Sequence, residues 1–87
     1  MSFTKALSQM AMKQGVRVNA VAPGPVWTPL IPSTMPDETL GSFGEDTPIG
    51  RAAQPAELAP AFVFLASDES RYITGEVIGV TGGKLLP

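Results

Sequence analysis

The sequence has 87 residues with a formal net charge of −2, and 44% of its residues are hydrophobic while 16% are charged. A chain of this length forms at most one small domain and buries only about 60% of the surface that its unfolded form exposes. Because it contains neither Cys nor His, disulfides, the common zinc sites and His-activated nucleophiles are excluded. It has no Lys/Arg-rich block and no apolar run of roughly 18–20 residues. The composition therefore predicts a cytoplasmic protein with neither nucleic-acid nor membrane partners.

The chain begins with a predicted helix over residues 2–14. Phe3, Leu7 and Met10 recur at helical spacing, and the following Gly15 is a typical helix stop. The next segment, 16–22, is rich in Val and Ala and contains only two polar residues. It predicts a strand that is buried on both faces.

A long connection over residues 23–54 follows and carries most of the Pro and Gly. One short helix is expected over residues 36–43, because Thr34 and Asp37 have the spacing of a capping box. A connection of this length inside a small chain is either functional or disordered.

The last two predicted elements are a helix and a strand. Pro55 suits the first position of the helix, and Glu57 lies in its first turn, where the helix dipole favours a carboxylate. The helix is expected to end at Ser67 and to kink near Pro60, which removes one of its hydrogen bonds. A second apolar strand is expected over residues 76–80.

The predicted order is thus helix, strand, long loop, helix and strand. Two buried strands joined through a helix predict an α/β fold with a parallel crossover. Two strands and two helices cannot cover both faces of a parallel sheet, so the first strand should leave an open edge. The sequence therefore predicts one partial domain, residues 1–87, that belongs to a larger core.

Two stretches carry a family resemblance: "GVRVNAVAPGPVWTP" at 15–29 and "PIGRAAQPAELAPAFVFLASDESRYITGEVIGVTGG" at 48–83. Together they resemble the C-terminal third of the short-chain dehydrogenase/reductase family, closest to a bacterial branch with aldehyde-reductase-like and general-stress oxidoreductases. The resemblance implies the C-terminal part of a doubly wound Rossmann fold, which in this family is usually tetrameric. It also implies that residues 23–54 hold the substrate lid.

Two motifs of the family are absent from this sequence. No stretch reads G-x-x-x-G-x-G, the glycine-rich loop that binds the pyrophosphate, and the acid–base pair Tyr-x-x-x-Lys does not occur. Tyr72 cannot replace that Tyr, because Glu76 stands where the Lys would be. We therefore expect no catalytic residue in this chain, and the resemblance puts the pair upstream. Thr81 stands where most members have Asp before the terminal Gly-Gly.

The resemblance implies a nicotinamide-binding loop directly after the first strand. Pro23 fixes the backbone, Gly24 lets it approach the ring, and Val26 offers its N–H and C=O to the carboxamide. The Thr28 hydroxyl can donate a hydrogen bond to the carboxamide or to a phosphate oxygen. The alternative for these residues is an ordinary turn that ends a strand.

The same resemblance implies a lid over the substrate pocket, formed by the side chains of Trp27, Leu30, Ile31, Met35 and Phe43. Alternatively, these side chains pack on the neighbouring helix. Asn19 is interpreted as a structural amide, with catalysis as the alternative, and Arg51 as a loop anchor or ion-pair partner, with substrate binding as the alternative. Four acidic residues of the loop lack the spacing of a metal site or a general acid and are expected to be solvated: Asp37, Glu38, Glu45 and Asp46.

We thus interpret the chain as the C-terminal segment of an oxidoreductase that uses NAD or NADP and acts on a small carbonyl or alcohol. Alone it should neither catalyse nor bind a dinucleotide, because the phosphate loop and the acid–base pair are missing. Its last helix and strand are expected to form a homo-oligomer contact. The alternative is a truncated product that serves as an interaction or assembly module for full-length subunits.

Overall fold

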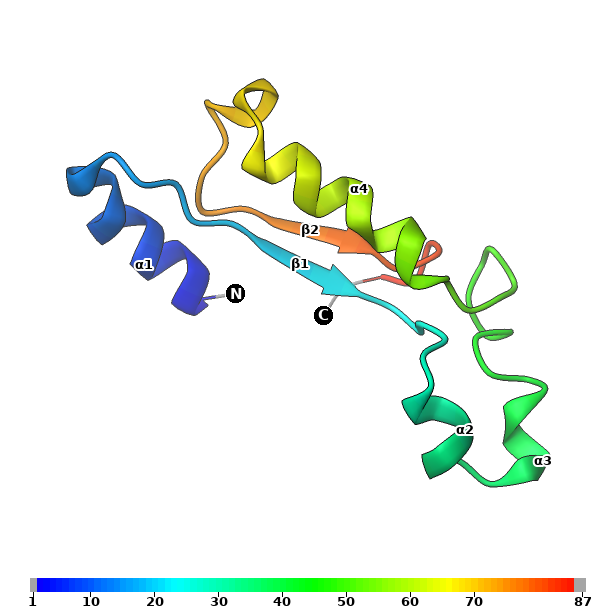
Figure 1. Cartoon of the computed structure of the whole chain (residues 1–87). Coiled ribbons are helices and arrows are strands. Elements are labelled where there is room, and N and C mark those ends of the chain that lie inside the picture. The colour runs from blue at the N-terminus through cyan, green and yellow to red at the C-terminus, as the bar shows by residue number, and fades with distance from the viewer. Residues whose placement is uncertain (1, 86–87) are drawn as a thin grey trace.

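The computed structural model describes residues 2–85, except for the side chain of Thr39, and Figure 1 shows its elements. Short 3₁₀ turns follow the first and the last helix, at Met12–Gln14 and Asp68–Ser70. The helices are α1 (Ser2–Ala11), α2 (Leu30–Thr34), α3 (Asp37–Leu40) and α4 (Pro55–Ala66), and the strands are β1 (Ala20–Pro23) and β2 (Val77–Val80).

The two strands form a parallel pair. Ala20 lies opposite Val77, and Pro23 lies opposite Val80. The predicted α/β order with two parallel strands is therefore confirmed. β1 is shorter than the predicted strand 16–22, because the backbone ahead of it bonds to a turn: the Val18 N–H donates to Thr74 Oγ1 at 3.1 Å.

One edge of β1 is open. The Ala20 N–H donates to the Glu76 carbonyl and the Gly24 N–H donates to the Val80 carbonyl, each at 2.9 Å. Because backbone groups alternate in direction along a strand, the N–H and C=O of Val21 point away from β2. Within the described part of the chain, no third strand pairs with that edge.

The helices lie on either side of this small sheet, with α4 along one side and α1 along the other (Figure 1). Gly15 follows the α1 region with a φ of 72°, and its N–H donates to the Met12 carbonyl, as a helix stop requires. α4 continues through Pro60, so this residue does not end the helix, and the predicted kink stays a prediction. None of the described helices has the length and apolar character needed to cross a membrane.

The predicted helix over residues 36–43 is only partly right. α3 covers residues 37–40, and residues 41–46 form turns instead. A further helix, α2, lies just before it in a Pro-rich stretch. Pro32 occupies its first turn, where a missing N–H breaks no helical hydrogen bond.

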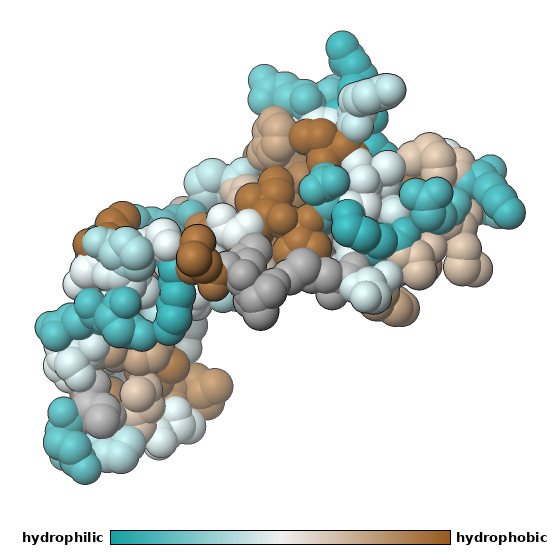
Figure 2. Space-filling model, turned by 180° about the vertical axis from the view of Figure 1, so that it is seen from behind, coloured by the Kyte–Doolittle hydropathy of each residue, from teal (hydrophilic) through white to brown (hydrophobic). Residues whose placement is uncertain are grey.

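None of the described apolar side chains is fully buried. Phe62 and Val63 of α4 are 56% and 68% exposed, and the buried polar side chains among the described residues are those of Ser8, Thr47 and Ser70. The radius of gyration is 15.7 Å, against about 12 Å for a compact domain of this length. Figure 2 shows apolar side chains gathered at the middle of the rear face. The apolar side chains that the structure describes thus stay partly exposed and form no closed core.

Candidate cofactor loop and lid

The loop 23–28 leaves the carboxyl end of β1 and stays close to the end of β2. A Cβ on Gly24 would lie 2.9 Å from the Thr81 Cα and 3.0 Å from the Thr81 carbonyl oxygen, so only Gly permits this approach. Through Gly24 the backbone ladder continues one residue beyond β1. The loop therefore starts from a fixed position at the carboxyl ends of both strands.

The backbone N–H and C=O of Val26 take no part in the hydrogen bonds that fix this loop. The Trp27 N–H donates to the Ala53 carbonyl at 2.8 Å, and the Ala53 N–H donates to the Pro25 carbonyl at 2.9 Å. These two bonds form an isolated parallel bridge between Val26 and Ala53. Because alternate residues of an extended chain face opposite ways, the N–H and C=O of Val26 point away from Ala53. Neither group has a hydrogen-bond partner among the described residues.

Thr28 closes the loop and leads into α2. Its carbonyl accepts a hydrogen bond from the Ile31 N–H at 3.0 Å. Its half-buried hydroxyl makes no hydrogen bond within the part of the chain that the structure describes. Thr28 therefore contributes a polar group on the same short loop as the open backbone of Val26.

The helices α2 and α3 project beyond the carboxyl ends of the strands as a two-helix lid, residues 29–43 (Figure 1). At its base the Trp27 and Phe43 rings lie 5.9 Å apart between centroids and are tilted by 57°. This contact holds the two ends of the lid together. Leu30 is 65% exposed, and Ile31 and Met35 are half-buried. The lid residues predicted from the sequence thus lie on one projecting unit.

The lid is followed by a return segment, residues 44–53, in which sequence reasoning considered only Glu45, Asp46 and Arg51. Thr47 is buried in it, and its hydroxyl donates to the Gly44 carbonyl at 2.8 Å and accepts from the Gly50 N–H at 3.2 Å. The Gly50 N–H also bonds the Thr47 carbonyl, which closes a β-turn. Thr-Pro-x-Gly is a recognisable sequence signal for such a turn, with Pro at the second position and Gly at the fourth.

Arg51 lies at the end of the return segment and pairs with α4. Its two terminal nitrogens contact the two carboxylate oxygens of Glu57 at 2.7 and 2.8 Å. This hydrogen bonding, together with the Gln54 N–H, lowers the pKa of Glu57 to about 2, and the same contact raises the pKa of Arg51. The prediction of Arg51 as an ion-pair partner is confirmed.

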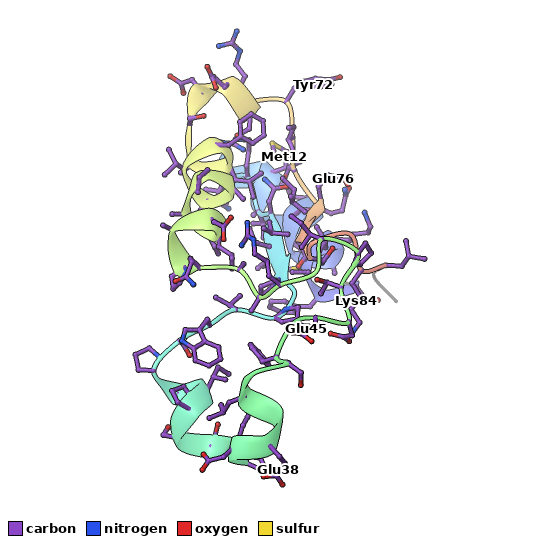
Figure 3. The ribbon with its side chains drawn as sticks, turned by 90° about the vertical axis from the view of Figure 1, so that its right-hand side faces the viewer. Met12, Glu38, Glu45, Tyr72, Glu76 and Lys84 are labelled. Carbon is purple, nitrogen blue, oxygen red and sulfur yellow. The ribbon has the colours of Figure 1, made fainter. Side chains whose placement is uncertain are left out.

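The acidic side chains of the lid region do not converge. Figure 3 shows Glu38 at the tip of the lid and Glu45 near its base, beside Lys84. Asp46 is exposed but paired, because its carboxylate lies 2.8 Å from the Lys84 ammonium, and hydrogen bonding to Lys84 lowers its pKa. Among the described residues, no group of three or more carboxylates is placed to hold a metal ion.

Asn19 and Tyr72 both lie away from the lid. The Asn19 amide donates to the Ile73 carbonyl and accepts from the Glu76 N–H, each at 3.0 Å, which confirms its predicted role. Tyr72 is fully exposed and lies at the opposite end of the molecule from the lid (Figure 3).

Known proteins resemble this chain over almost its whole length. A family model described as enoyl-(acyl carrier protein) reductase matches residues 1–84. General stress protein 39 of Bacillus subtilis (strain 168) is 55% identical over 85 residues, which cover 98% of this chain and 30% of that protein. NADPH-dependent aldehyde reductase 1, chloroplastic, of Arabidopsis thaliana is 46% identical over 86 residues, which cover 98% of this chain and 30% of that protein.

The comparison with solved structures agrees with the sequence comparisons. A 3-oxoacyl-(acyl-carrier protein) reductase from Brucella melitensis ATCC 23457 superposes with a TM-score of 0.83 at 36% identity and covers 99% of this chain. The match takes in only 32% of that reductase, and the chain likewise spans about 30% of the length of the relatives above. The family match, the sequence identities and the shared fold together show that this chain belongs to the short-chain dehydrogenase/reductase family.

Proposed function

We propose that this chain is the C-terminal segment of an NAD(P)(H)-dependent oxidoreductase that interconverts a small carbonyl compound and an alcohol in the cytoplasm. The observation that supports this most directly is the open backbone of Val26, on the same short loop as Thr28 and at the carboxyl end of a parallel sheet. Ligands of such sheets bind outside the carboxyl ends of their strands. The Arabidopsis relative is named as an NADPH-dependent aldehyde reductase, which agrees with this choice of cofactor.

The residues present fit the carboxamide of a nicotinamide ring. A primary amide offers one acceptor oxygen and an NH₂ donor group, and a single extended residue offers the complementary N–H and C=O. Val26 would therefore bind the carboxamide in two places, with the Thr28 hydroxyl as a further donor. Pro23 and Gly24 hold this backbone in place, and the bound nicotinamide would supply the hydride chemistry.

The lid would shape the substrate pocket and keep water out. Trp27, which forms the base of the lid with Phe43, belongs to the cofactor loop itself, so a substrate over the nicotinamide would lie beside Trp27. Leu30, Ile31 and Met35 would provide the apolar lining, which suits a small carbonyl or alcohol. Removal of water around the reacting atoms strengthens the polar contacts within such a site.

The chain alone should be inactive, because it contains neither the Tyr-x-x-x-Lys pair nor the glycine-rich phosphate loop. An upstream segment of the family type would have to supply both. We further propose that α4 and β2 form a contact between subunits of a homo-oligomer. This rests on the exposed apolar side chains of α4, including Phe62 and Val63.

The test is a hybrid enzyme in which residues 1–87 replace the matching part of general stress protein 39. Its oxidation of NADH and NADPH would be followed with a panel of small aldehydes and ketones, next to the upstream part alone and the 87-residue chain alone. We expect activity in the hybrid and none in either part. A hybrid that folds but oxidises neither cofactor with any carbonyl would refute the proposed function.

A second candidate function is assembly with full-length subunits through the open edge of β1. The free N–H and C=O of Val21 favour it, because an unpaired edge recruits further strands. Light scattering of the 87-residue chain mixed with full-length general stress protein 39 would test it. A stable mixed complex at defined stoichiometry would support the assembly function, and two unchanged species would argue against it.

A further inference from the structure

The turn formed by residues 81–84 lies between two segments that are far from it in sequence. On one side, Gly24 lies against the backbone of Thr81, at distances that leave no room for a Cβ. On the other side, the Ile49 N–H donates to the Gly82 carbonyl at 2.9 Å. The turn thus contacts the loop that carries Val26 and also the return segment that follows the lid.

The fit between the turn and the return segment depends on its two glycines. Gly82 and Gly83 have φ values of 68° and 97°, which L-residues with a side chain rarely adopt. A Cβ on Gly82 would lie 2.7 Å from Ile49 Cγ2, and a Cβ on Gly83 would lie 2.9 Å from Pro48 Cβ. Both glycines therefore form a surface against which residues 48 and 49 lie directly.

Further contacts complete the junction. The ammonium group of Lys84 pairs with Asp46 at 2.8 Å, at the start of the return segment. The turn, the loop and the return segment also enclose a hollow of about 180 Å³, lined in part by Pro25, Ile49 and Gly82. The three segments thus meet around one partly open hollow.

We infer that the 81–84 turn positions the loop 23–28, and that Gly82 is a positioning residue for the backbone of Val26. The bridge between Val26 and Ala53 fixes the direction of the Val26 N–H and C=O, and Ala53 belongs to the return segment that the turn holds at Ile49. A displaced turn therefore shifts both partners of this bridge. The importance of this for cofactor binding rests on the proposed function, whereas the mechanical coupling does not.

Hydrogen exchange of the 87-residue chain tests the coupling directly. The amides of Trp27 and Ala53 report the bridge, and the Ala20 amide, bonded to Glu76 in the sheet, is the internal reference. In Gly82→Ala we expect exchange at Trp27 and Ala53 to rise at least about tenfold relative to Ala20, because the new methyl group displaces Ile49.

Two further variants separate this effect from backbone strain. Gly15→Ala has nearly the same φ, 72°, but a Cβ there meets no atom within 4 Å, so the exchange ratio should not change. Ile49→Ala in the Gly82→Ala background removes the side chain that the methyl group meets, and should restore most of the protection at Trp27 and Ala53.

Three outcomes would overturn the inference. The first is an unchanged ratio in Gly82→Ala, the second is an equal loss in Gly15→Ala, and the third is no protection of Trp27 and Ala53 in the unsubstituted chain. Because none of these measurements needs a cofactor or activity, failure here is distinguishable from failure of the hybrid enzyme to oxidise NAD(P)H.

Discussion

Arg51 and Glu57 join the end of the return segment to the first turn of α4 through a two-pronged ion pair at 2.7 and 2.8 Å. Glu57 also accepts the Gln54 N–H at 2.8 Å, so a single carboxylate caps the helix and holds the loop. Both interactions are strongest when the Glu57 carboxylate is charged. The start of α4 should therefore become less stable when acid protonates Glu57.

The first prediction concerns pH. The pKa of Glu57 is lowered from 4.5 to about 2, so its contribution to stability is complete above about pH 4.5 and is lost as the pH falls toward 2. As the pH falls through that range, hydrogen exchange of the backbone amides at the start of α4 should become faster relative to their intrinsic exchange rates. Glu57→Gln should abolish this dependence, and the exposed lid residue Glu38, changed to Gln, serves as the matched control. Identical pH profiles for Glu57→Gln and the unsubstituted chain would contradict the prediction.

A second prediction concerns Thr28 in the hybrid enzyme. Replacing Thr28 with Ala removes one hydrogen bond, worth about 0.5–1.5 kcal/mol, so the KM for the cofactor should rise several-fold. Ser33→Ala is the control, because its exposed hydroxyl bonds only the Leu30 carbonyl of its own helix. If KM and kcat both stay unchanged in Thr28→Ala, the hydroxyl makes no useful contact with the cofactor.

The third prediction is that the purified 87-residue chain binds no dinucleotide at physiological concentrations. One loop cannot offset the entropy lost in holding so large a ligand when the pyrophosphate site is missing. Titration calorimetry with NADH and NADPH checks this. A micromolar Kd for either cofactor would show that the chain contains a more complete site than its motifs indicate.

The fourth prediction concerns Arg17, whose guanidinium donates to the carbonyls of Leu65, Ser67 and Ile73 and to the Ser70 hydroxyl, over distances of 2.9–3.3 Å. Arg17→Ala removes these four charge-assisted hydrogen bonds, which tie the chain ahead of β1 to the end of α4 and to the turn before β2. It should lower the free energy of unfolding of the hybrid by about 2 kcal/mol. Arg71→Ala is the matched control, because Arg71 is exposed and its side chain makes no hydrogen bond within the described residues. Equal urea midpoints for the two variants would argue against this role.

The fifth prediction is that the isolated chain self-associates through the open edge of β1. Val21→Pro removes an N–H that points away from β2, so it should spare the existing ladder and shift the chain toward monomer. Ala22→Pro, which removes a ladder N–H, should unfold the sheet instead. Size-exclusion chromatography with light scattering, carried out over a dilution series, measures the oligomeric state of each variant. A clean monomer with a cooperative, concentration-independent melt would rule out this association.

Residues that start or stop a helix predicted the helix boundaries that depend on contacts between neighbours in sequence. Pro55 and Glu57 marked the start of α4, and Gly15 marked the helix stop that its φ of 72° confirms. Apolar runs, together with these Gly and Pro signals, predicted the order of α1, β1, α4 and β2. The family resemblance predicted that the loop 23–28 binds the nicotinamide, and this role remains a prediction.

The parts that sequence reasoning missed depend on contacts between distant residues. β1 begins at Ala20 because Val18 bonds Thr74, a pairing that no local pattern reveals. The role of Gly82 follows from its contact with Ile49 and not from its own neighbours in sequence. α2 was missed for a different reason, because a Pro in the first turn of a helix is indistinguishable from a Pro in a loop.

The parallel pairing of β1 with β2 also determines when this segment can fold. Asn19 and Glu76 meet across 57 positions of chain, and the lid and α4 lie between them. Closing such a loop costs entropy before any strand contact is gained, which slows folding. During synthesis β1 therefore emerges long before its partner, and its apolar residues remain unpaired until the chain has been made as far as Val80. In this interval a chaperone or a strand of a neighbouring chain can bind β1 first.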